Sequence, residues 1–284
     1  MHLVMIGGSD AGISAALRAR ELDPVADITV VLADAYPNFS ICGIPYYLSG
    51  EVTHWRNLAH RTLADLEAAG MRLRLDTTAR RIDVPGRKLL VTTAAGGEEL
   101  LGYDKLVIGT GAVPVRPPIT GLSGPDALGP ADGVHLLHSM GDTFAVMRTL
   151  EQAAPARAVI VGAGYIGLEM ADALVHRGLK VTLINRPSEV LSTVDPELGQ
   201  LVRKELDRKG VRVLCGREIQ SINELQDGKV CVRDSKGFEA SADFVLVGVG
   251  VRPASELAES AGIKIGEAES PGRTLLQSPP NADE

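Results

Sequence analysis

The sequence has little of two features that would mark a membrane protein or a metal protein, namely long apolar runs and cysteine. No run approaches the roughly 20 consecutive apolar residues that a membrane-spanning helix needs, and the N-terminus enters a strand pattern directly. The three cysteines, Cys42, Cys215 and Cys231, are too few for a disulfide framework and lack the CxxC spacing of zinc sites. We therefore expect a cytoplasmic protein without a membrane segment or a metal, in which a functional cysteine acts alone.

Basic residues are fewer than acidic ones. The chain carries 36 acidic and 29 basic residues, which gives a formal net charge of −7. This balance disfavours nucleic acid and anionic membrane surfaces as partners. A small-molecule substrate is the expected partner.

Two stretches of the chain follow the same pattern of strand, glycine turn, helix and strand. The first runs through LVMIGG, AGISAALRARELD and ITVVLAD, and the second through RAVIVGAG, YIGLEMADALVHRG and KVTLIN, from Arg157 to Asn185. Short apolar runs that end in glycine and open a helix are typical of βαβ units with parallel strands. The repeat predicts an α/β fold with two three-layer, Rossmann-like domains in tandem.

Composition suggests where these domains divide. The proline-rich segment VPVRPPITG, residues 113–121, is typical of an extended crossover. We place one domain at residues 1–118 and the other at 119–250. The apolar run FVLVGVGVRP, residues 244–253, is expected to return the chain to the first domain over residues 251–284, with a disordered tail from about Gly266.

The motif GAGYIG at residues 162–167 matches GxGxxG after a predicted strand and at the start of a helix, which is the context that the motif requires. Gly162 permits the tight turn, Gly164 lets a pyrophosphate approach the backbone, and Gly167 allows close packing of helix on strand. N–H groups at the helix start, around Tyr165 and Ile166, can bind the phosphates. This motif predicts a nicotinamide dinucleotide site.

The end of the second strand in such a unit usually separates NAD from NADP. An acid there hydrogen-bonds the ribose 2′-OH, whereas a basic residue accommodates a 2′-phosphate. This chain has Asn185 followed by Arg186, with no carboxylate at this point of the sequence. The pattern favours NADPH over NADH, unless Arg186 only faces solvent.

The first glycine turn, GGSDAG at residues 7–12, keeps the outer glycines and has serine at the middle position. Its place at the start of a two-copy chain favours a flavin dinucleotide, with the pyrophosphate over the helix start. Leu32 stands where the acid that binds the ribose is expected, so Asp34 is the nearest substitute. The candidate residues of this site are Gly7, Gly8, Ser9, Ala11, Gly12 and Asp34.

Cys42 lies in NFSICGIPYYLSGEV, just before a predicted helix. A thiol at a helix N-terminus gains from the helix dipole, which favours the nucleophilic thiolate. For a cysteine taken alone, a small buried apolar residue is the simpler interpretation. The motifs elsewhere in the chain favour a functional role for Cys42 over this interpretation.

Five motifs follow one another along the chain: GGSDAG, FSICGIPYYLSGEV, YDKLVIGTGAVPVRPPITG, GAGYIGLE and ADFVLVGVGVRP. Together they resemble the pyridine nucleotide-disulfide oxidoreductases, in particular the single-cysteine branch of that family. This branch contains coenzyme A-disulfide reductases, NADH oxidases or peroxidases, and polysulfide reductases. The resemblance implies FAD in the first domain, NADPH or NADH in the second, and Cys42 as the redox centre. It also implies that Cys42 forms a mixed disulfide with a small thiol or a sulfenic acid.

The resemblance implies further site residues. Thr110, Gly111 and Pro114 would close over FAD, while Ser40 and Tyr46 would lie near the flavin or the thiol substrate. Glu169, Gly248 and Gly250 would lie near the nicotinamide. Turn capping, packing or solvent exposure are alternative roles for several of these residues.

The sequence after Gly266 departs from the family, whose members continue into a strand ending in Gly-Asp and a dimerisation domain. This departure suggests a truncated chain with a compromised homodimer. Three functions remain open: an FAD-dependent NAD(P)H reductase of a small disulfide or persulfide, an NAD(P)H oxidase or peroxidase acting through a Cys42 sulfenate, and a catalytically incompetent remnant that binds a nucleotide.

Overall fold

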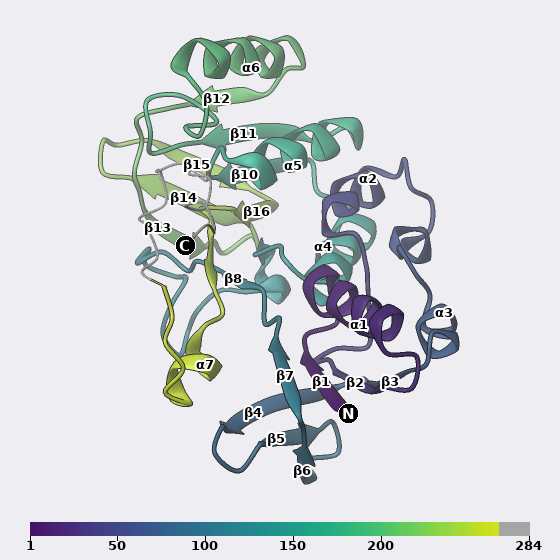
Figure 1. Cartoon of the computed structure of the whole chain (residues 1–284). Coiled ribbons are helices and arrows are strands. Elements are labelled where there is room, and N and C mark those ends of the chain that lie inside the picture. Colours follow the sequence, from purple (N-terminus) through teal and green to yellow (C-terminus); the bar gives the residue numbers. More distant parts are fainter. Residues whose placement is uncertain (267–284) are drawn as a thin grey trace. The chain divides into compact units, whose positions relative to one another are not determined.

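The computed structural model describes residues 1–266, which form two compact units (Figure 1). The first comprises Met1–Val115, His138–Phe144 and Val251–Ile265, and the second comprises Arg116–Leu137 and Ala145–Gly250. The chain leaves the first unit within the proline-rich segment and returns to it at Val251. The assignment of His138–Phe144 to the first unit has no counterpart in the sequence pattern. The expected tail, residues 267–284, lies outside the described residues.

The first unit is built on a four-stranded parallel sheet in the order β3-β2-β1-β7. Successive side chains of a strand point to opposite faces. Leu3 and Met5 therefore pack on the side of α1, whereas Val4 and Ile6 belong to a separate cluster on the other face. The elements are β1 (His2–Ile6), α1 (Asp10–Leu22), β2 (Asp27–Val31), α3 (Leu63–Ala68), β3 (Met71–Arg74) and β7 (Lys105–Ile108).

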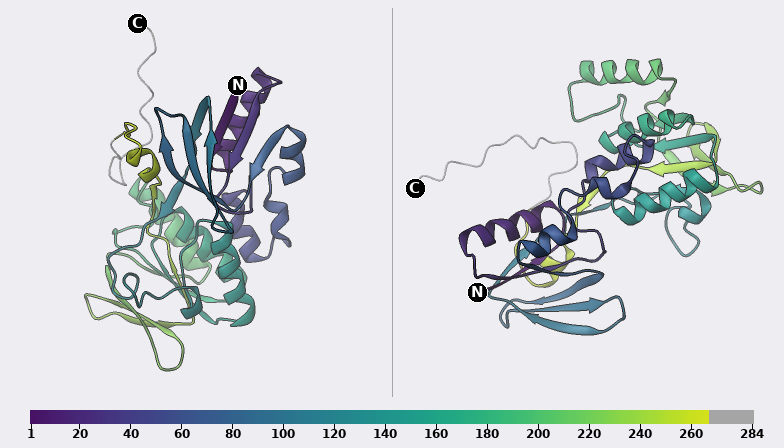
Figure 2. Two further views of the ribbon diagram at one scale, coloured as in Figure 1. Left: turned by 90° about the horizontal axis from the view of Figure 1, so that it is seen from below. Right: turned by 90° about the vertical axis from the view of Figure 1, so that its right-hand side faces the viewer.

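A three-stranded antiparallel sheet covers that other face of the parallel sheet. It consists of β4 (Thr77–Asp83), β5 (Lys88–Thr93) and β6 (Glu98–Gly102), and its buried residues join the cluster of Val4 and Ile6. Figure 2 shows α1 and this antiparallel sheet on opposite sides of the parallel sheet. The returning chain adds α7 (Glu256–Ser260) to the same cluster, after pairing β17 (Val251–Pro253) with β8 (Ala112–Pro114). The unit thus has three layers.

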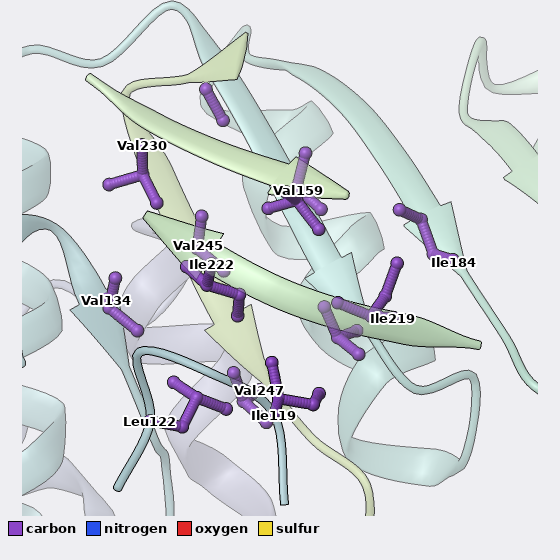
Figure 3. Packing of buried hydrophobic residues seen from close by; sticks show 13 residues of the cluster. Ile119, Leu122, Val134, Val159, Ile184, Ile219, Ile222, Val230, Val245 and Val247 are labelled. Carbon is purple, nitrogen blue, oxygen red and sulfur yellow. The ribbon is translucent and has the colours of Figure 1, made fainter. Parts of the chain in front are cut away.

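The second unit has a five-stranded parallel sheet in the order β12-β11-β10-β16-β9. Its core contains Val159 and Val161 of β10, Val245 and Val247 of β16, and apolar residues of an antiparallel sheet (Figure 3). The parallel strands are β9 (Val134–His135), β10 (Arg157–Val161), β11 (Lys180–Ile184), β12 (Arg212–Leu214) and β16 (Phe244–Val247). The antiparallel strands are β13 (Ile219–Glu224), β14 (Val230–Asp234) and β15 (Glu239–Ala242).

The helices between Arg116 and Gly250 are η3 (Pro130–Asp132), α4 (Met140–Gln152), α5 (Tyr165–His176) and α6 (Pro196–Arg208), of which α4 begins in the segment that belongs to the first unit. The repeated βαβ pattern is confirmed as β1-α1-β2 and β10-α5-β11. Strand β16 belongs to the second sheet, so the return to the first unit begins only after Gly250. Within residues 1–266, no helix combines the length and hydropathy that a bilayer span requires, and no three His, Cys, Asp or Glu residues are grouped to hold a metal ion.

Candidate functional site

The first glycine turn connects β1 to α1 and is closed tightly by backbone contacts. Gly7 has a φ of +103°, and its N–H donates to the Val31 carbonyl at 2.9 Å. A Cβ on Gly7 would overlap the Gly109 carbonyl, and a Cβ on Gly12 would overlap the Gly7 carbonyl. Both outer positions of the motif therefore require glycine.

The middle of this turn faces solvent. Ser9 is the N-cap residue of α1, is exposed, and makes no side-chain capping hydrogen bond. Ala11 is exposed in the first turn of the helix. Gly8 is buried against Leu32, whose side chain occupies the space that a Cβ on Gly8 would need. The turn can thus present N–H groups to an anion at its open side.

Asp34 lies in the loop after β2, where its carboxylate accepts the Tyr36 N–H at 2.9 Å. Partial loss of solvent raises the pKa of the Asp34 carboxyl, and nearby Asp76 raises it further, while the Tyr36 hydrogen bond opposes both. The side chain is therefore engaged with its own loop. Its assignment to a ribose remains a prediction.

The second glycine turn connects β10 to α5 and repeats this construction. Gly162 has a φ of +107°, and a Cβ there would overlap the Gly248 carbonyl. A Cβ on Gly167 would overlap the Gly162 carbonyl. The ends of β10 and β16 meet here, because the Gly248 N–H donates to the Val161 carbonyl at 2.8 Å. This contact brings Gly248 beside the predicted pyrophosphate turn.

Gly164 differs from the outer glycines of its motif, because a Cβ on Gly164 would meet no described atom within 4 Å apart from the adjoining backbone. It is the N-cap residue of α5 and is exposed, as is Tyr165. Open space beside an uncapped helix N-terminus is the cradle that a pyrophosphate needs, and a side chain at this position would fill it. The second turn therefore fits a dinucleotide.

Asn185 follows β11, and both polar atoms of its side chain bind the backbone. Its Oδ1 accepts the Ala163 N–H at 3.2 Å, and its Nδ2 donates to the Glu189 carbonyl at 2.7 Å. The residue is only 7% exposed. Asn185 thus braces the glycine turn, while the next residue, Arg186, is exposed and pairs with Glu218.

Two further residues of the second unit face solvent. Glu169 lies on α5 after the glycine turn, and partial burial of its carboxyl raises its pKa. Gly250 has a φ of +113°, with no described atom near the position of a Cβ. The roles of both residues beside the nicotinamide remain predictions.

Cys42 lies in a segment of the first unit, residues 40–58, which we call the Cys42 excursion. A hydrogen bond between its first and last residues, Ser40 and Leu58, closes the base of this excursion. The excursion contains η1 (Ile41–Gly43), α2 (Ile44–Ser49) and η2 (Trp55–Leu58). The Ser40 N–H donates to the Leu58 carbonyl at 2.8 Å, and the Ser40 hydroxyl accepts the Gly43 N–H at 3.2 Å. Cys42 itself is exposed within the 3₁₀ turn, and Tyr46 is exposed on α2. The sulfur is therefore open to a soluble reactant.

Asn38 connects this excursion to the first glycine turn, which the sequence motifs do not reveal. The Asn38 N–H donates to the Gly8 carbonyl at 2.7 Å, and its own carbonyl accepts the His60 N–H at 2.9 Å. Its side chain contacts Asp10 at 3.3 Å. Asn38 is buried with a φ of +56°, a conformation that asparagine tolerates better than most residues. The only sequence signal is its turn context, YPN.

Aromatic packing holds the same excursion in place. Trp55 makes edge contacts with Tyr36 and Phe144, at ring-centroid distances of 5.6 and 5.4 Å, and Phe39 lies 5.5 Å from it. Aromatic pairs of this kind add packing energy beyond the burial of their area. Phe144 belongs to the short segment 138–144, so these contacts explain why that segment joins the first unit.

The loop after β7 is fixed by the returning chain. The Thr110 hydroxyl donates to the Ala254 carbonyl at 2.7 Å, and the Ala254 N–H donates to the Gly111 carbonyl at 3.0 Å. Pro114 lies opposite Val251 in the β8–β17 pair. Residues 251–254 therefore shape the loop that the family resemblance assigns to FAD.

The other two cysteines lie in the second unit. Cys231 is buried in β14, and its thiol donates to Glu239 at 3.2 Å. Burial raises the pKa of both Cys215 and Cys231. Neither thiol is as exposed as Cys42.

The chain matches known proteins over nearly its whole length. It is 30% identical over 269 residues to the NADH oxidase of Methanocaldococcus jannaschii, and 33% identical over 267 residues to the NAD(P)H sulfur oxidoreductase (CoA-dependent) of Pyrococcus furiosus. These matches cover 94% and 93% of this chain but 58% and 57% of the relatives. The chain thus spans little more than half the length of these relatives.

Solved structures of related proteins also match the chain over nearly its whole length. A NAD-dependent persulfide reductase from A. fulgidus matches with a TM-score of 0.86 and 38% identity, covering 94% of this chain and 48% of that one. The reduced CoADR-RHD of Bacillus anthracis matches with a TM-score of 0.87 and 26% identity, covering 93% of this chain and 46% of that one. The family model described as pyridine nucleotide-disulphide oxidoreductase matches residues 1–271. The chain therefore belongs to the pyridine nucleotide-disulphide oxidoreductase family.

Proposed function

We propose that the chain carries out electron transfer from NADH or NADPH, through bound FAD, to a low-molecular-weight disulfide or persulfide of the coenzyme A type. The observation that carries this proposal is the backbone link from the first glycine turn to the excursion that bears Cys42. Through Asn38, an exposed thiol is connected to the turn that would hold the flavin dinucleotide. FAD would accept a hydride from the nicotinamide and supply two electrons to sulfur.

Each unit has residues that fit one dinucleotide. In the first unit, Gly7, Gly8, Ser9, Ala11 and Gly12 would hold the pyrophosphate of FAD, with Thr110 and Gly111 in the neighbouring loop. In the second unit, Gly162, Gly164 and Gly167 would hold that of NAD(P)H, because the space beside Gly164 is open. Both assignments use the same preference of helix N-termini for anions.

Cys42 would act as the nucleophile. Its thiolate attacks one sulfur of a disulfide RS–SR′, so that a Cys42–S–S–R bond forms and R′S⁻ leaves. Two electrons and a proton then convert this mixed disulfide to the Cys42 thiolate and RSH. Exposure of the thiol suits attack on an external substrate, and Tyr46 is an exposed neighbour that could contact it.

The names of relatives support this substrate class. The P. furiosus relative is described as a CoA-dependent sulfur oxidoreductase, and a 28% identical relative from Staphylococcus haemolyticus as a coenzyme A disulfide reductase. The solved relative at 38% identity is described as a persulfide reductase. A small sulfur compound is therefore the substrate to test first.

The test is an anaerobic titration of the purified, FAD-supplemented chain with NADPH or NADH, followed by coenzyme A disulfide. We expect flavin reduction and then reoxidation with release of coenzyme A. Cys42→Ser should keep flavin reduction but lose reoxidation by the disulfide, whereas the control Cys215→Ser should keep both. Undiminished disulfide reduction by Cys42→Ser would contradict the proposal.

A second candidate is NAD(P)H oxidase or peroxidase activity, because the M. jannaschii relative is described as an NADH oxidase and the Cys42 thiol is exposed. In that reaction the Cys42 thiolate attacks hydrogen peroxide, so that a sulfenic acid forms and hydroxide leaves, and two electrons and a proton then return the sulfenic acid to the thiolate with release of water. Product analysis separates the two: coenzyme A thiol for the reductase, water for the oxidase. A colourless protein that binds NADPH but retains no added FAD would instead indicate a nucleotide-binding remnant.

A further inference from the structure

Arg186 and Glu218 form an ion pair at the end of β11, with 3.6 Å between Nη1 and Oε1. Glu218 comes from the loop between β12 and β13, which is distant in sequence from the glycine motif. Two backbone hydrogen bonds hold that loop against the end of β11: the Gly216 N–H donates to the Pro187 carbonyl at 2.9 Å, and the Arg217 N–H to the Asn185 carbonyl at 3.0 Å. The position of Glu218 beside Arg186 is therefore set by the backbone.

The neighbouring polar side chains have hydrogen-bond or ion-pair partners other than Arg186 and Glu218. Both polar atoms of the Asn185 side chain bind the backbone. Arg217 pairs with the buried carboxylate of Asp234 at 2.6 Å, and the Lys236 ammonium donates to the Gly216 carbonyl at 3.0 Å. By contrast, the side chains of Arg186 and Glu218 are 79% and 65% exposed. Arg186 and Glu218 therefore form an exposed pair of opposite charges at this strand end, and the exposed Lys236 ammonium lies nearby at the Gly216 carbonyl.

We propose that Glu218 sets the choice of dinucleotide, by holding Arg186 and repelling a 2′-phosphate, so that the chain prefers NADH. This inference rests on the proposed function, because the second unit must bind a nicotinamide dinucleotide at the GAGYIG turn. The residue after β11 is the usual point of discrimination at the adenosine ribose. A phosphate must displace Glu218 from Arg186 and approach a like charge, whereas a 2′-OH meets neither obstacle.

The solvent exposure of the Arg186–Glu218 pair allows a role in nucleotide selectivity to be distinguished from a role in folding stability. An ion pair between two exposed side chains contributes little to folding stability. Removing the Glu218 charge should therefore change nucleotide affinity without changing the melting temperature. Because the effect is electrostatic and solvent-exposed, it should also shrink as the salt concentration rises. The sequence pattern favours NADPH because it shows Arg186 without a carboxylate; the fold brings that carboxylate from another element.

The experiment measures dissociation constants of the full chain for NADH and NADPH by nicotinamide fluorescence, at two salt concentrations. Wild type should bind NADH more tightly. Glu218→Gln should tighten NADPH binding about tenfold, equivalent to about 1.4 kcal/mol, and leave NADH binding within about twofold. The matched control Glu205→Gln removes an exposed partner of Arg208 on α6 and should change neither constant. Adding Arg186→Ala to Glu218→Gln should abolish the gain.

The outcomes distinguish two failures. If both nucleotides bind and Glu218→Gln leaves their affinity ratio unchanged, the role of Glu218 is refuted and the proposed function stands. If wild type prefers NADPH, the direction of the inference is also refuted. A folded chain that binds neither nucleotide overturns the proposed function, and this assignment with it.

Discussion

The backbone N–H of Asn38 donates to the carbonyl of Gly8 at 2.7 Å, and this bond joins the first glycine turn to the base of the Cys42 excursion. The same residue accepts the His60 N–H, so it links three segments of the first unit. Its φ of +56° and its burial leave little freedom to change it. The geometry of the turn and the position of the excursion should therefore depend on this asparagine.

Asn38→Ala should test that dependence. Alanine disfavours the left-handed conformation and loses the contact with Asp10, so we expect a loss of about 1–2 kcal/mol in the free energy of unfolding, together with weaker FAD binding. Denaturant unfolding and flavin titration measure the two effects. The exposed Asn57 provides the control Asn57→Ala, and equal behaviour of both variants would contradict the role of Asn38.

The two glycines of the second turn should respond differently to alanine. Gly162→Ala creates a clash with the Gly248 carbonyl at a positive φ, so we expect a destabilisation of several kcal/mol or failure to fold. The Cβ of Gly164→Ala would meet no described atom beyond the adjoining backbone, so we expect an unchanged melting temperature with NAD(P)H affinity reduced about tenfold or more. Thermal unfolding and nucleotide titration separate the two, and tight nucleotide binding by a folded Gly164→Ala would exclude the pyrophosphate from that space.

The three thiols should react at different rates. Cys42 is exposed, whereas burial raises the pKa of Cys215 and Cys231 and lowers their thiolate fraction at neutral pH. We expect iodoacetamide at pH 7 to label Cys42 faster than the others by about tenfold or more, and Cys231 only after unfolding. Peptide mass spectrometry measures the order, and early labelling of Cys231 would show that β14 is not protected.

Acid should weaken the second unit through Asp234. Burial alone would raise the pKa of this carboxyl, but Arg217 and the N–H groups of Phe238 and Lys236 together hold it below its ordinary value of 3.8. A carboxyl with a lowered pKa in the folded state stabilises the protein above about pH 4, and this contribution disappears as the pH falls through the folded pKa.

Asp234→Asn should therefore lower the melting temperature at pH 7, and its difference from wild type should shrink towards pH 3. Thermal unfolding across this pH range measures that difference. Asp207→Asn, which removes an exposed carboxylate on α6, controls for the change in net charge. A difference that stays constant with pH would show that the charge of Asp234 is not responsible.

Local patterns predict the parts of the fold that depend on local chemistry. The two βαβ units follow from apolar runs that end at Gly7 and Gly162, because strand, tight turn and helix are specified within a few residues of each other. The same reasoning identifies the family, since the motifs lie in the expected order. The outer glycines need no long-range information to be recognised.

The remaining features depend on contacts between distant segments. Phe144 joins the first unit because its ring packs on Trp55, and no periodicity of the sequence indicates this pairing. Asn185 braces its own glycine turn, which a comparison of residue types at the strand end cannot show. Likewise, Glu218 approaches Arg186 only because β12 lies beside β11.

The closed base of the Cys42 excursion has a consequence for limited proteolysis. Gly50 and Glu51 form an exposed tip, while Ser40 and Leu58 are hydrogen-bonded to each other and Ile44 and Leu48 are buried. A single cut at the tip would leave both new ends anchored without a covalent connection. The nicked protein should therefore migrate as one particle under native conditions and separate into two fragments only in denaturant.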